Sequence, residues 1–568
     1  MSKDIKNLSI AVLLSTLILL GWQFFYEAPR KVKVEQIQQV VRENKIVQKE
    51  LQVLKAKQAI DDEFRSNNEP AGTVIINTDK LKGSISLKGL RFDDLELKAY
   101  KKDLSSDSPL VRVFSNENIK AYFAEFGWIK DSIDQSFTVP DKNSIWKCDA
   151  AELSLNAPIN CNWHSNTGVY YSIEIAIDDN YLFTINQTVE NKTSESINLA
   201  NYGRIYKARA DLKQFAIVHE GAIGVFSDVL KESTYEDLSK ERQEVFSNTP
   251  GSWAGFTNKY WLSALIPDPN FTSKTHFLAT PGEDQQDVFN INYISQDVTL
   301  KSGDKVRSVN HLFAGAKEEE LLETYTKDNN FVLFDRAIDY GVLYFFTKPL
   351  LGVISYFYTL LGNFGLAIIL VTLVLKLLMY PLSYKSFVSM NRMKELQPKI
   401  EQIKQRHGED KIKFNQEIME LYKREKVSPA AGCLPMLIQI PIFFGLYKVI
   451  FIALEMRHAP FYGWIKDLSV QDPTSLWNAF GLMPWPQLGM IDIGLWPLIM
   501  AATMFFQQKL SPAPTDPIQA TVMKFMPVML VFMLYSLPSG LMIYWSFSNL
   551  LSILQQYMIG KTVARKKK

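Results

Sequence analysis

Apolar residues are concentrated at the two ends of this 568-residue chain, and their distribution constrains the fold more than any other feature. A run reading FGLAIILVTLVLKLLMYPL extends from Phe364 to Leu382, and it is about as long as a helix needs to cross a bilayer. Four further apolar runs follow at about residues 432–454, 494–510, 523–537 and 539–557. With one more run near the N-terminus, they predict a polytopic α-helical membrane protein with six spans.

The run near the N-terminus, residues 8–26, carries no charged residue and ends in Glu27-Ala28-Pro29. A cleaved secretory signal is the alternative interpretation. However, the run is longer than the apolar part of a typical signal, and no small-x-small cleavage site follows it. The sequence therefore predicts an uncleaved transmembrane anchor over residues 1–27, followed by a helical or partly disordered linker over residues 28–66.

The polar middle of the chain, residues 67–335, consists of short alternating runs separated by Gly, Asn, Asp and Pro. Runs such as Thr73 to Ile76 and Tyr181 to Val189 are typical of half-buried strands. They predict a large all-β domain built as a sandwich of stacked antiparallel sheets. Its histidines lack the spacing of metal ligands and no catalytic constellation is evident, so we expect no metal, no cofactor and no enzyme activity.

Two of the three cysteines, Cys148 and Cys161, fall in this domain, whereas Cys433 lies far away in an apolar run. In an oxidising compartment Cys148 and Cys161 could form a disulfide across neighbouring strands. Two unrelated buried thiols are an equally good alternative. The net charge of +2 provides no domain-wide positive field, which argues against a nucleic-acid-binding protein.

The distribution of Lys and Arg predicts the orientation of the spans. Residues 383–428, between the second and third spans, are crowded with both residue types and are expected in the cytoplasm. Alternation of sides then places both termini in the cytoplasm, including the basic tail 559–568, and the β domain on the outer side. Residues 336–363 are aromatic-rich and amphipathic, which predicts a helix lying along the membrane interface. A five-helix core over residues 364–558 completes the predicted architecture.

The cytoplasmic segment 383–428 is expected to form a hairpin of two amphipathic helices. The apolar face of the first helix contains Met393, Leu396, Ile400 and Ile403. Such a hairpin could dock on the membrane surface or hold an apolar nascent segment. A solvated spacer is an equally good alternative.

Lys376 interrupts the second span, where a lysine at the bilayer centre costs about 2.5 to 3.5 kcal/mol. It follows Phe364 by about 18 Å along the helix, so its side chain could also reach the cytoplasmic interface. Polar residues on the same helix and on other spans favour a polar cavity over that alternative; they are Thr372, Gln439, Gln508 and Tyr544. No acidic residue lies in the spans, so the charge would be available to an acidic segment of a visiting chain.

The C-terminal half closely resembles the YidC family of membrane protein insertases. The resemblance rests on a series of motifs in order, which are Met379-Tyr380-Pro381-Leu382, Leu396-Gln397-Pro398-Lys399-Ile400, Gly432-Cys433 with Pro435, Leu437-Ile438-Gln439, Pro441-Ile442-Phe443, Pro460-Phe461, Trp464, Asp467-Leu468-Ser469, Asp472-Pro473, Pro538-Ser539-Gly540-Leu541 and Ser548-Asn549. It implies an inner-membrane protein with a periplasmic β-supersandwich, related in shape to sugar-mutarotase domains. It also implies a hydrophilic groove that receives the polar segment of a nascent membrane protein and releases its apolar helix into lipid.

The same resemblance implies that the Sec translocon, the ribosome and the signal-recognition machinery are partners. Two positions depart from the commonest Gram-negative pattern, in which the groove charge is arginine and a second tyrosine follows Tyr544. Here these positions are Lys376 and Trp545. Lysine keeps the charge but lacks the planar fork of arginine, and Trp545 keeps an aromatic surface without a hydroxyl.

Two other classes of function remain open from the residues alone. A secondary transporter would also place an ionisable side chain among polar groups, although the spans show no evident inverted repeat. A membrane-anchored carbohydrate-binding protein or mutarotase-like enzyme is the third interpretation, and it depends only on the shape expected for the β domain.

Overall fold

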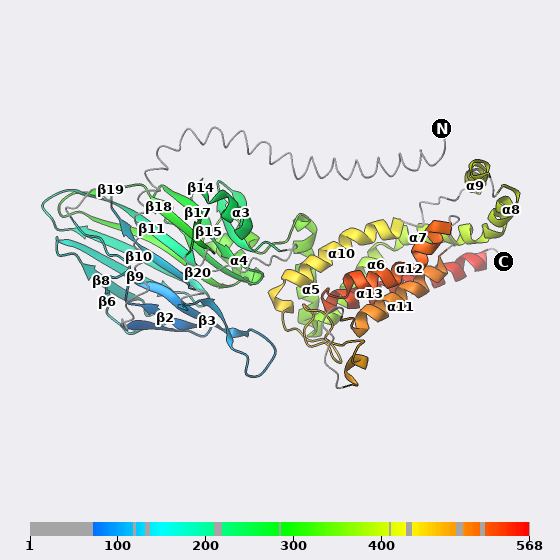
Figure 1. Ribbon diagram of the computed structural model, residues 1–568, viewed down its shortest axis with the longest axis horizontal. Helices are drawn as coiled ribbons and strands as arrows, with labels where there is room; N and C mark the ends of the chain where they lie inside the picture. Colours follow the sequence, from blue (N-terminus) through cyan, green and yellow to red (C-terminus); the bar gives the residue numbers. More distant parts are fainter. Residues whose placement is uncertain are drawn as a thin grey trace. The chain divides into compact units, whose positions relative to one another are not determined.

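The computed structural model describes residues 72–117, 121–130, 137–208, 218–282, 286–407, 410–425, 427, 434–483, 492–511 and 517–566. The predicted anchor (residues 1–27), the linker (residues 28–66) and Cys433 lie outside these residues. The described chain begins with a β-sandwich and continues into helices (Figure 1).

Two sheets stack face to face in the β domain. The larger sheet has eleven strands, which are β1 (Thr73–Asn77), β2 (Leu81–Ser86), β3 (Arg91–Lys101), β4 (Leu110–Phe114), β5 (Tyr122–Ile129), β7 (Glu152–Leu153), β11 (Ile197–Lys207), β14 (Gln243–Ser247), β17 (Ser273–Pro281), β18 (Asp287–Ser295) and β19 (Val298–Leu300). Its main path runs in the order β14-β17-β18-β11-β5-β3-β2-β1-β7. Neighbouring strands pair antiparallel except β1 and β7, which are parallel.

The smaller sheet has nine strands in the order β13-β12-β15-β16-β20-β10-β9-β8-β6. These are β6 (Lys147–Cys148), β8 (Ile159–His164), β9 (Val169–Ile177), β10 (Leu182–Asn191), β12 (Gly221–Phe226), β13 (Val229–Thr234), β15 (Trp253–Thr257), β16 (Trp261–Ile266) and β20 (Lys305–Ala316). Alternation along β9, with Val169, Tyr171 and Ile173 buried and the residues between them more exposed, directs one face inward. The two inner faces form an aromatic core, in which the Phe92 and Phe183 rings lie 5.2 Å apart.

The chain crosses between the two sheets at both of their sides. Residues 147–153 supply β6 to the end of one sheet and β7 to the end of the other. On the opposite side, β13 is followed by α3 (Tyr235–Glu241) and then by β14. Thr234 begins α3 by accepting the amide hydrogen of Asp237 at 3.0 Å, which satisfies one of the free donors of the first turn.

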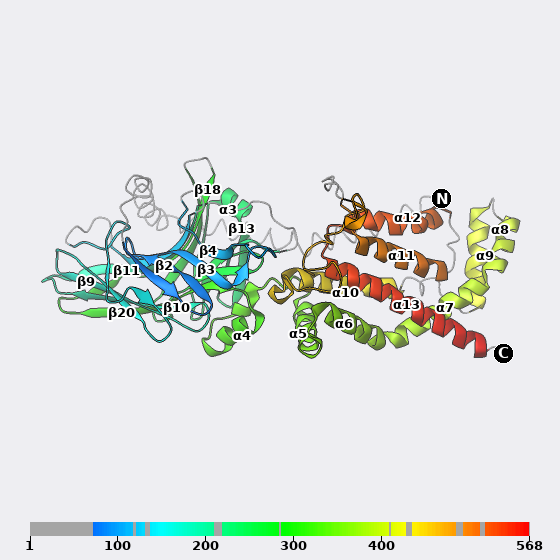
Figure 2. The same cartoon turned by 90° about the horizontal axis from the view of Figure 1, so that it is seen from below.

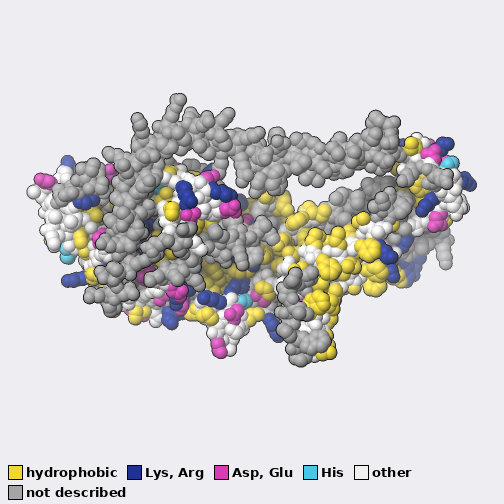
Figure 3. Space-filling model, in the orientation of Figure 1, with side chains coloured by type: hydrophobic (Ala, Val, Ile, Leu, Met, Phe, Trp, Pro, Cys, Tyr) yellow, Lys and Arg dark blue, Asp and Glu magenta, His cyan; other side chains and the backbone are white. Residues whose placement is uncertain are grey.

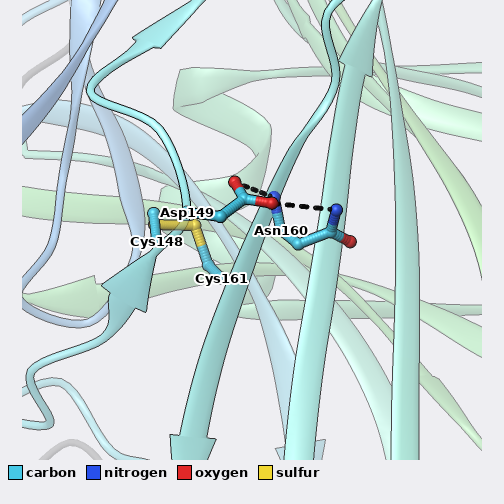
Figure 4. Close-up of a disulfide and its surroundings, with 4 residues drawn as sticks. All are labelled: Cys148, Asp149, Asn160 and Cys161. Atoms are coloured by element: carbon cyan, nitrogen blue, oxygen red, sulfur yellow. Dashed lines mark hydrogen bonds between the residues drawn. A yellow bond between two sulfur atoms is a disulfide. The ribbon is translucent and has the colours of Figure 1, made fainter.

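The structure joins Cys148 of β6 to Cys161 of β8 in a disulfide (Figure 4). The two residues are directly opposite in the antiparallel register. Next to them, the Asp149 carboxylate accepts hydrogen bonds from the backbone and side-chain nitrogens of Asn160 at 2.8 and 3.2 Å. The sheet edge at β6 is therefore tied to β8 by both covalent and polar contacts.

The domain predicted as all-β also contains helices, which corrects that expectation. In addition to α3, a helix α4 (Glu319–Asp328) and a short 3₁₀ segment η4 (Phe334–Ala337) follow the last strand. The cause lies in the sequence of α4, EELLETYTKD, which lacks Gly, Pro and β-strand alternation and buries only Leu322 and Tyr325. The β-sandwich itself is as predicted.

The C-terminal region is helical. It contains α5 (Tyr344–Leu361), α6 (Phe364–Leu378), α7 (Tyr380–Glu395), α8 (Gln397–His407), α9 (Lys411–Arg424), α10 (Leu434–Ile452), α11 (Leu495–Leu510), α12 (Pro517–Leu534) and α13 (Ser539–Lys566). Figure 1 and Figure 2 both show α6, α10, α11, α12 and α13 running side by side. Gly362 ends α5 in the left-handed conformation, and the Asn363 side chain begins α6 by accepting the Leu366 amide hydrogen at 3.1 Å.

The run that the sequence predicted as a single span at residues 364–382 is broken. Helix α6 ends at Leu378, and α7 continues at an angle of 68°. Pro381 lies in the first turn of α7, where a missing amide hydrogen costs nothing. The predicted first helix of the hairpin is likewise divided at Leu396, because Pro398 is tolerated only in the first turn of the new helix α8.

Within the described ranges, no single helix is both long and apolar enough to meet the criterion for a membrane span. The bent pair α6–α7 meets it jointly, and two shorter apolar helices occur at Ile438–Ile452 and Ala520–Leu534. Residues 403–419, at the tip of the predicted hairpin, belong to a separate compact unit. In that unit His407 Nε2 lies 3.0 Å from a carboxylate oxygen of Glu417.

Candidate functional site

Lys376 lies in the last turn of α6, and its side chain turns into the helical bundle. The ammonium donates to Ser552 Oγ of α13 at 2.8 Å and to Gln439 Oε1 of α10 at 3.4 Å. Both acceptors are neutral, and in the described part of the chain Lys376 forms no ion pair. The site is therefore a three-helix junction that holds a positive charge without neutralising it.

Further hydrogen bonds orient Gln439, one of the two acceptors. The Gln439 amide nitrogen donates to the Tyr544 hydroxyl, which leaves the amide oxygen facing the ammonium. Ser548 donates to the same oxygen at 3.5 Å. Tyr544 is 1% exposed, so its hydroxyl fixes the amide in a buried position. These contacts bring together Lys376, Gln439 and Tyr544, three of the residues selected from the sequence.

A backbone contact also ties α6 to α13. The side-chain amide of Gln555 donates to the backbone carbonyl of Lys376 at 3.3 Å. That carbonyl lies close to the end of α6, where carbonyl groups lack partners within the helix. Gln555 therefore fixes the position of Lys376 along α13.

Thr372 and Trp545 have different environments. Thr372 is buried one turn before Lys376, and its hydroxyl donates to the Ile368 carbonyl of its own helix at 2.7 Å. Trp545 is half buried on α13, and its ring meets that of Phe443 edge to face at 4.7 Å. The hydroxyl hydrogen of Thr372 is thus used within its own helix. Trp545 and Phe443 form an aromatic contact between α13 and α10.

Gln508 lies on α11, at a second polar contact between helices. There, Asn549 donates to Thr503 at 3.2 Å, and Gln556 donates to the Leu510 carbonyl at 2.8 Å. The Gln508 side-chain nitrogen is buried without a hydrogen-bond partner. Gln508 thus takes no part in the hydrogen bonds around Lys376.

At the opposite end of the bundle, residues 464–474 pack over the beginnings of α11 and α13. The Asp472 carboxylate accepts the Trp496 amide hydrogen at 2.8 Å and the Trp464 indole hydrogen at 3.0 Å. These contacts place a negative charge at the N-terminus of α11, where the helix dipole favours it. A β-carbon at Gly494 would lie 2.5 Å from the Asp472 side chain, so only glycine permits this close approach. This end of the bundle is closely packed.

The four apolar hairpin residues divide between helices. Met393 is on α7, Leu396 lies at the break, and Ile400 and Ile403 are on α8. Leu396 and Ile400 are buried, and Met393 and Ile403 are half buried. No binding role for them follows from these positions.

The sequence analysis did not assign Ser548, Ser552 or Gln555 to the site, although Ser548 belongs to one of the family motifs. Together with Tyr544 they recur every three or four residues, so they share one face of α13. That spacing was available in the sequence. Serines in apolar helices usually donate to their own backbone, however, so the pattern alone did not distinguish a site from ordinary helix packing.

The fold and the site define a helical bundle that buries a polar cluster among apolar side chains and exposes many apolar side chains, joined to a β-sandwich. A model described as 60Kd inner membrane protein matches residues 356–567, and a model described as YidC periplasmic domain matches residues 73–353. The chain belongs to the YidC family of inner-membrane protein insertases, which are not enzymes.

Relatives of similar length support this assignment. A membrane protein insertase YidC of Rickettsia bellii is 46% identical over 565 residues, covering 99% of this chain and 100% of the relative. One of Rickettsia felis is 45% identical over 576 residues, with the same coverage. Secondary transport and carbohydrate binding, the two alternatives left open by the sequence, receive no support from these relatives.

Two solved structures are also similar to this chain. An active YidC insertase with its first transmembrane domain resolved matches 89% of this chain and 98% of its own, with 18% identity and a TM-score of 0.36. A galactose mutarotase-like protein from Lactobacillus casei covers 43% of this chain and 100% of its own, with 12% identity and a TM-score of 0.33. These scores are too low to carry an argument.

Proposed function

We propose that this protein inserts nascent membrane proteins by receiving their acidic segments at Lys376. The observation that carries the proposal is the ammonium held by two neutral oxygens, from Ser552 and Gln439. Neutral acceptors stabilise the charged form while leaving the net charge in place. Two unit charges about 4 Å apart attract by about 4 kcal/mol at the effective dielectric constant of a protein surface, which is enough to hold a carboxylate briefly.

The surroundings of the ammonium fit a transient substrate. Trp545 and Phe443 present aromatic surface on α13 and α10 beside the polar junction, and an apolar helix could slide over them towards lipid. At the other end, Asp472 and its partners support a bundle closed on the outer side. In this proposal the polar tail of a substrate enters the groove from the cytoplasm, and its apolar helix leaves sideways.

The proposal includes six spans, with both termini in the cytoplasm and the β domain in the periplasm. It assigns residues 1–27 to an anchor, 28–66 to a linker, 67–335 to the β domain, 336–363 to an interfacial helix and 364–558 to the insertase core. The Lys and Arg residues of segment 383–428 support this orientation. The Sec translocon, the ribosome and the signal-recognition machinery are the partners proposed.

The test replaces the chromosomal copy with variants and follows a small single-span substrate by protease accessibility of its translocated tail. The substrate is used in two forms, one with an acidic tail and one with a neutral tail. Lys376→Glu is expected to reduce insertion of the acidic form more than tenfold, because attraction becomes repulsion. Lys376→Arg, which keeps the charge, is the matched control and should retain insertion.

Two outcomes would contradict parts of the proposal. Normal insertion of both substrates after depletion of the protein would contradict the insertase function in this cell. Normal insertion of the acidic form by Lys376→Glu would contradict only the electrostatic role of the site.

A further inference from the structure

The hydroxyl of Ser552 has a fixed orientation. It donates to the Ser548 carbonyl at 2.9 Å, one turn earlier on α13. Because a hydroxyl has only one hydrogen, the contact with Lys376 must use a lone pair of the serine oxygen. Ser552 is 5% exposed, so water does not compete freely for that lone pair. Ser552 is thus a buried acceptor aimed at the ammonium.

An ammonium group carries three hydrogens. Ser552 and Gln439 accept two of them, at 2.8 and 3.4 Å. Both acceptors are held by other contacts, Ser552 by its own helix and Gln439 by Tyr544. Among the described residues no group accepts the third hydrogen, which is therefore available to a substrate. A single carboxylate oxygen matches that donor, whereas the two parallel hydrogen bonds of an arginine fork have no counterpart here.

The lysine side chain could also adopt a conformation that points away from the junction. Its four-carbon stem has many rotamers and could extend towards the nearby cytoplasmic interface. An ammonium at that interface would be solvated and withdrawn from the junction. The 2.8 Å contact with Ser552 is the shorter of the two side-chain contacts that oppose this movement.

From these contacts we propose that Ser552 is a positioning residue, which holds the Lys376 ammonium inside the bundle so that its remaining hydrogen meets one carboxylate of a substrate tail. The inference rests on the proposed insertase function. It adds a residue on α13 to the substrate site and restricts recognition to one carboxylate oxygen at a time.

The experiment compares Ser552→Ala with Ser546→Ala. Ser546 is a matched control, because it is also buried on α13 and donates to a carbonyl one turn earlier, Met542 at 2.8 Å, but does not contact Lys376. Ser552→Ala should lower insertion of the acidic-tail substrate about tenfold, the effect of one lost hydrogen bond to a charged group. It should leave the neutral-tail substrate within about twofold, and Ser546→Ala should leave both unchanged.

Two more variants separate positioning from a structural role. Ser552→Thr keeps the hydroxyl and should restore insertion of the acidic-tail substrate. In a Lys376→Met background, Ser552→Ala should have no further effect, since there is no ammonium left to position. Equal losses for both substrates, or an undiminished loss in the Met background, would overturn the inference.

The result for Lys376→Met alone distinguishes this inference from the proposed function. If Lys376→Met inserts the acidic-tail substrate normally, the proposed role of the groove charge fails. If Lys376→Met is defective while Ser552→Ala is normal, only the positioning role of Ser552 fails.

Discussion

One charged side chain in the β domain and one in the helical region have opposite surroundings. In the β domain, Glu125 lies 3.4 Å from Arg91 and 3.0 Å from Arg204, and all three side chains are mostly buried. In the helical region, the ammonium of Lys376 meets only neutral oxygens in the part of the chain that is described. Glu125 is thus compensated by opposite charges, whereas the described residues give the Lys376 ammonium no counter-charge.

The two regions also differ in where apolar side chains lie. Phe92, Phe183 and Phe277 are buried between the sheets of the β domain. Helix α12, in contrast, leaves Phe525 and Phe532 more than half exposed. Figure 3 shows hydrophobic side chains gathered over the helical region, whereas on the β domain charged side chains lie among them. A chain that passes from water into lipid needs this reversal, since apolar exposure is unfavourable only in water.

The largest expected effect tests the difference in the exposure of apolar side chains between the two regions. Phe277→Ala should lower the free energy of unfolding by about 4 kcal/mol, because the residue is fully buried and its removal leaves a cavity. Phe532→Ala, at a 52% exposed site, should change it by less than about 0.5 kcal/mol. Urea unfolding of the full chain in detergent measures both. Similar losses at the two sites would contradict the proposed reversal.

The next effect concerns charge. Glu125→Gln should destabilise the protein by about 3 kcal/mol, because two buried guanidinium groups lose their shared carboxylate. Lys376→Met should instead leave stability unchanged or raise it by about 1 kcal/mol, because no counter-charge is orphaned. The same unfolding experiment compares the variants. A loss of stability in Lys376→Met would mean that the ammonium is compensated after all.

The disulfide is expected to contribute somewhat less. It links residues separated by 13 positions, for which the chain-entropy model gives about 2 to 3 kcal/mol. Replacing Cys148 and Cys161 together by serine should lower stability by that amount. Reduction of the unchanged protein with dithiothreitol should have a matching effect, and it should have none on the double variant.

The smallest effect is a pH dependence of the β domain. Burial lowers the pKa of His276 from 6.5 to about 4, and Lys274 acts in the same direction. The imidazole is therefore neutral in the folded protein, and Gln243 lies 3.2 Å from its Nδ1. Below about pH 6.5 the unfolded chain binds the proton more readily, so stability should fall by about 2 kcal/mol between about pH 7.5 and pH 5.

His276→Asn is the matched variant for that prediction. Asparagine offers Gln243 a similar acceptor but cannot be protonated in this range. The variant should lose less stability than the wild type on acidification, as measured by thermal unfolding at several pH values. An unchanged acid sensitivity would assign the effect to other groups.

Local signals explain why parts of the fold were predictable. Gly362-Asn363 marks a helix end followed by a helix start, because glycine adopts the left-handed conformation and asparagine caps the next helix. The alternation of β9 likewise reports its buried face directly. The lysine in the apolar run of α6 also identified the centre of the candidate site, because the free-energy cost of a charge in such a run can be judged from the neighbouring residues alone.

Features that depend on partners distant in the sequence were less accessible. Whether Cys148 faces Cys161 depends on the pairing of the two-residue strand β6, and no local pattern fixes so short a strand. The contact of Ser552 with Lys376 exists only because α13 packs against α6, and the two residues are 176 positions apart in the sequence. Gln508 was grouped with Lys376 because polarity alone does not report which face of α11 meets which face of α13.

The two crossings between the sheets have a consequence for a protein that handles unfolded chains. Open sheet edges present unpaired amide and carbonyl groups to any extended segment nearby, and such pairing starts aggregation. Here the terminal strands on one side, β6 and β7, contain two residues each, and the disulfide of Cys148 holds β6 against β8. On this side of the domain, little free backbone is therefore left for another extended segment to pair with.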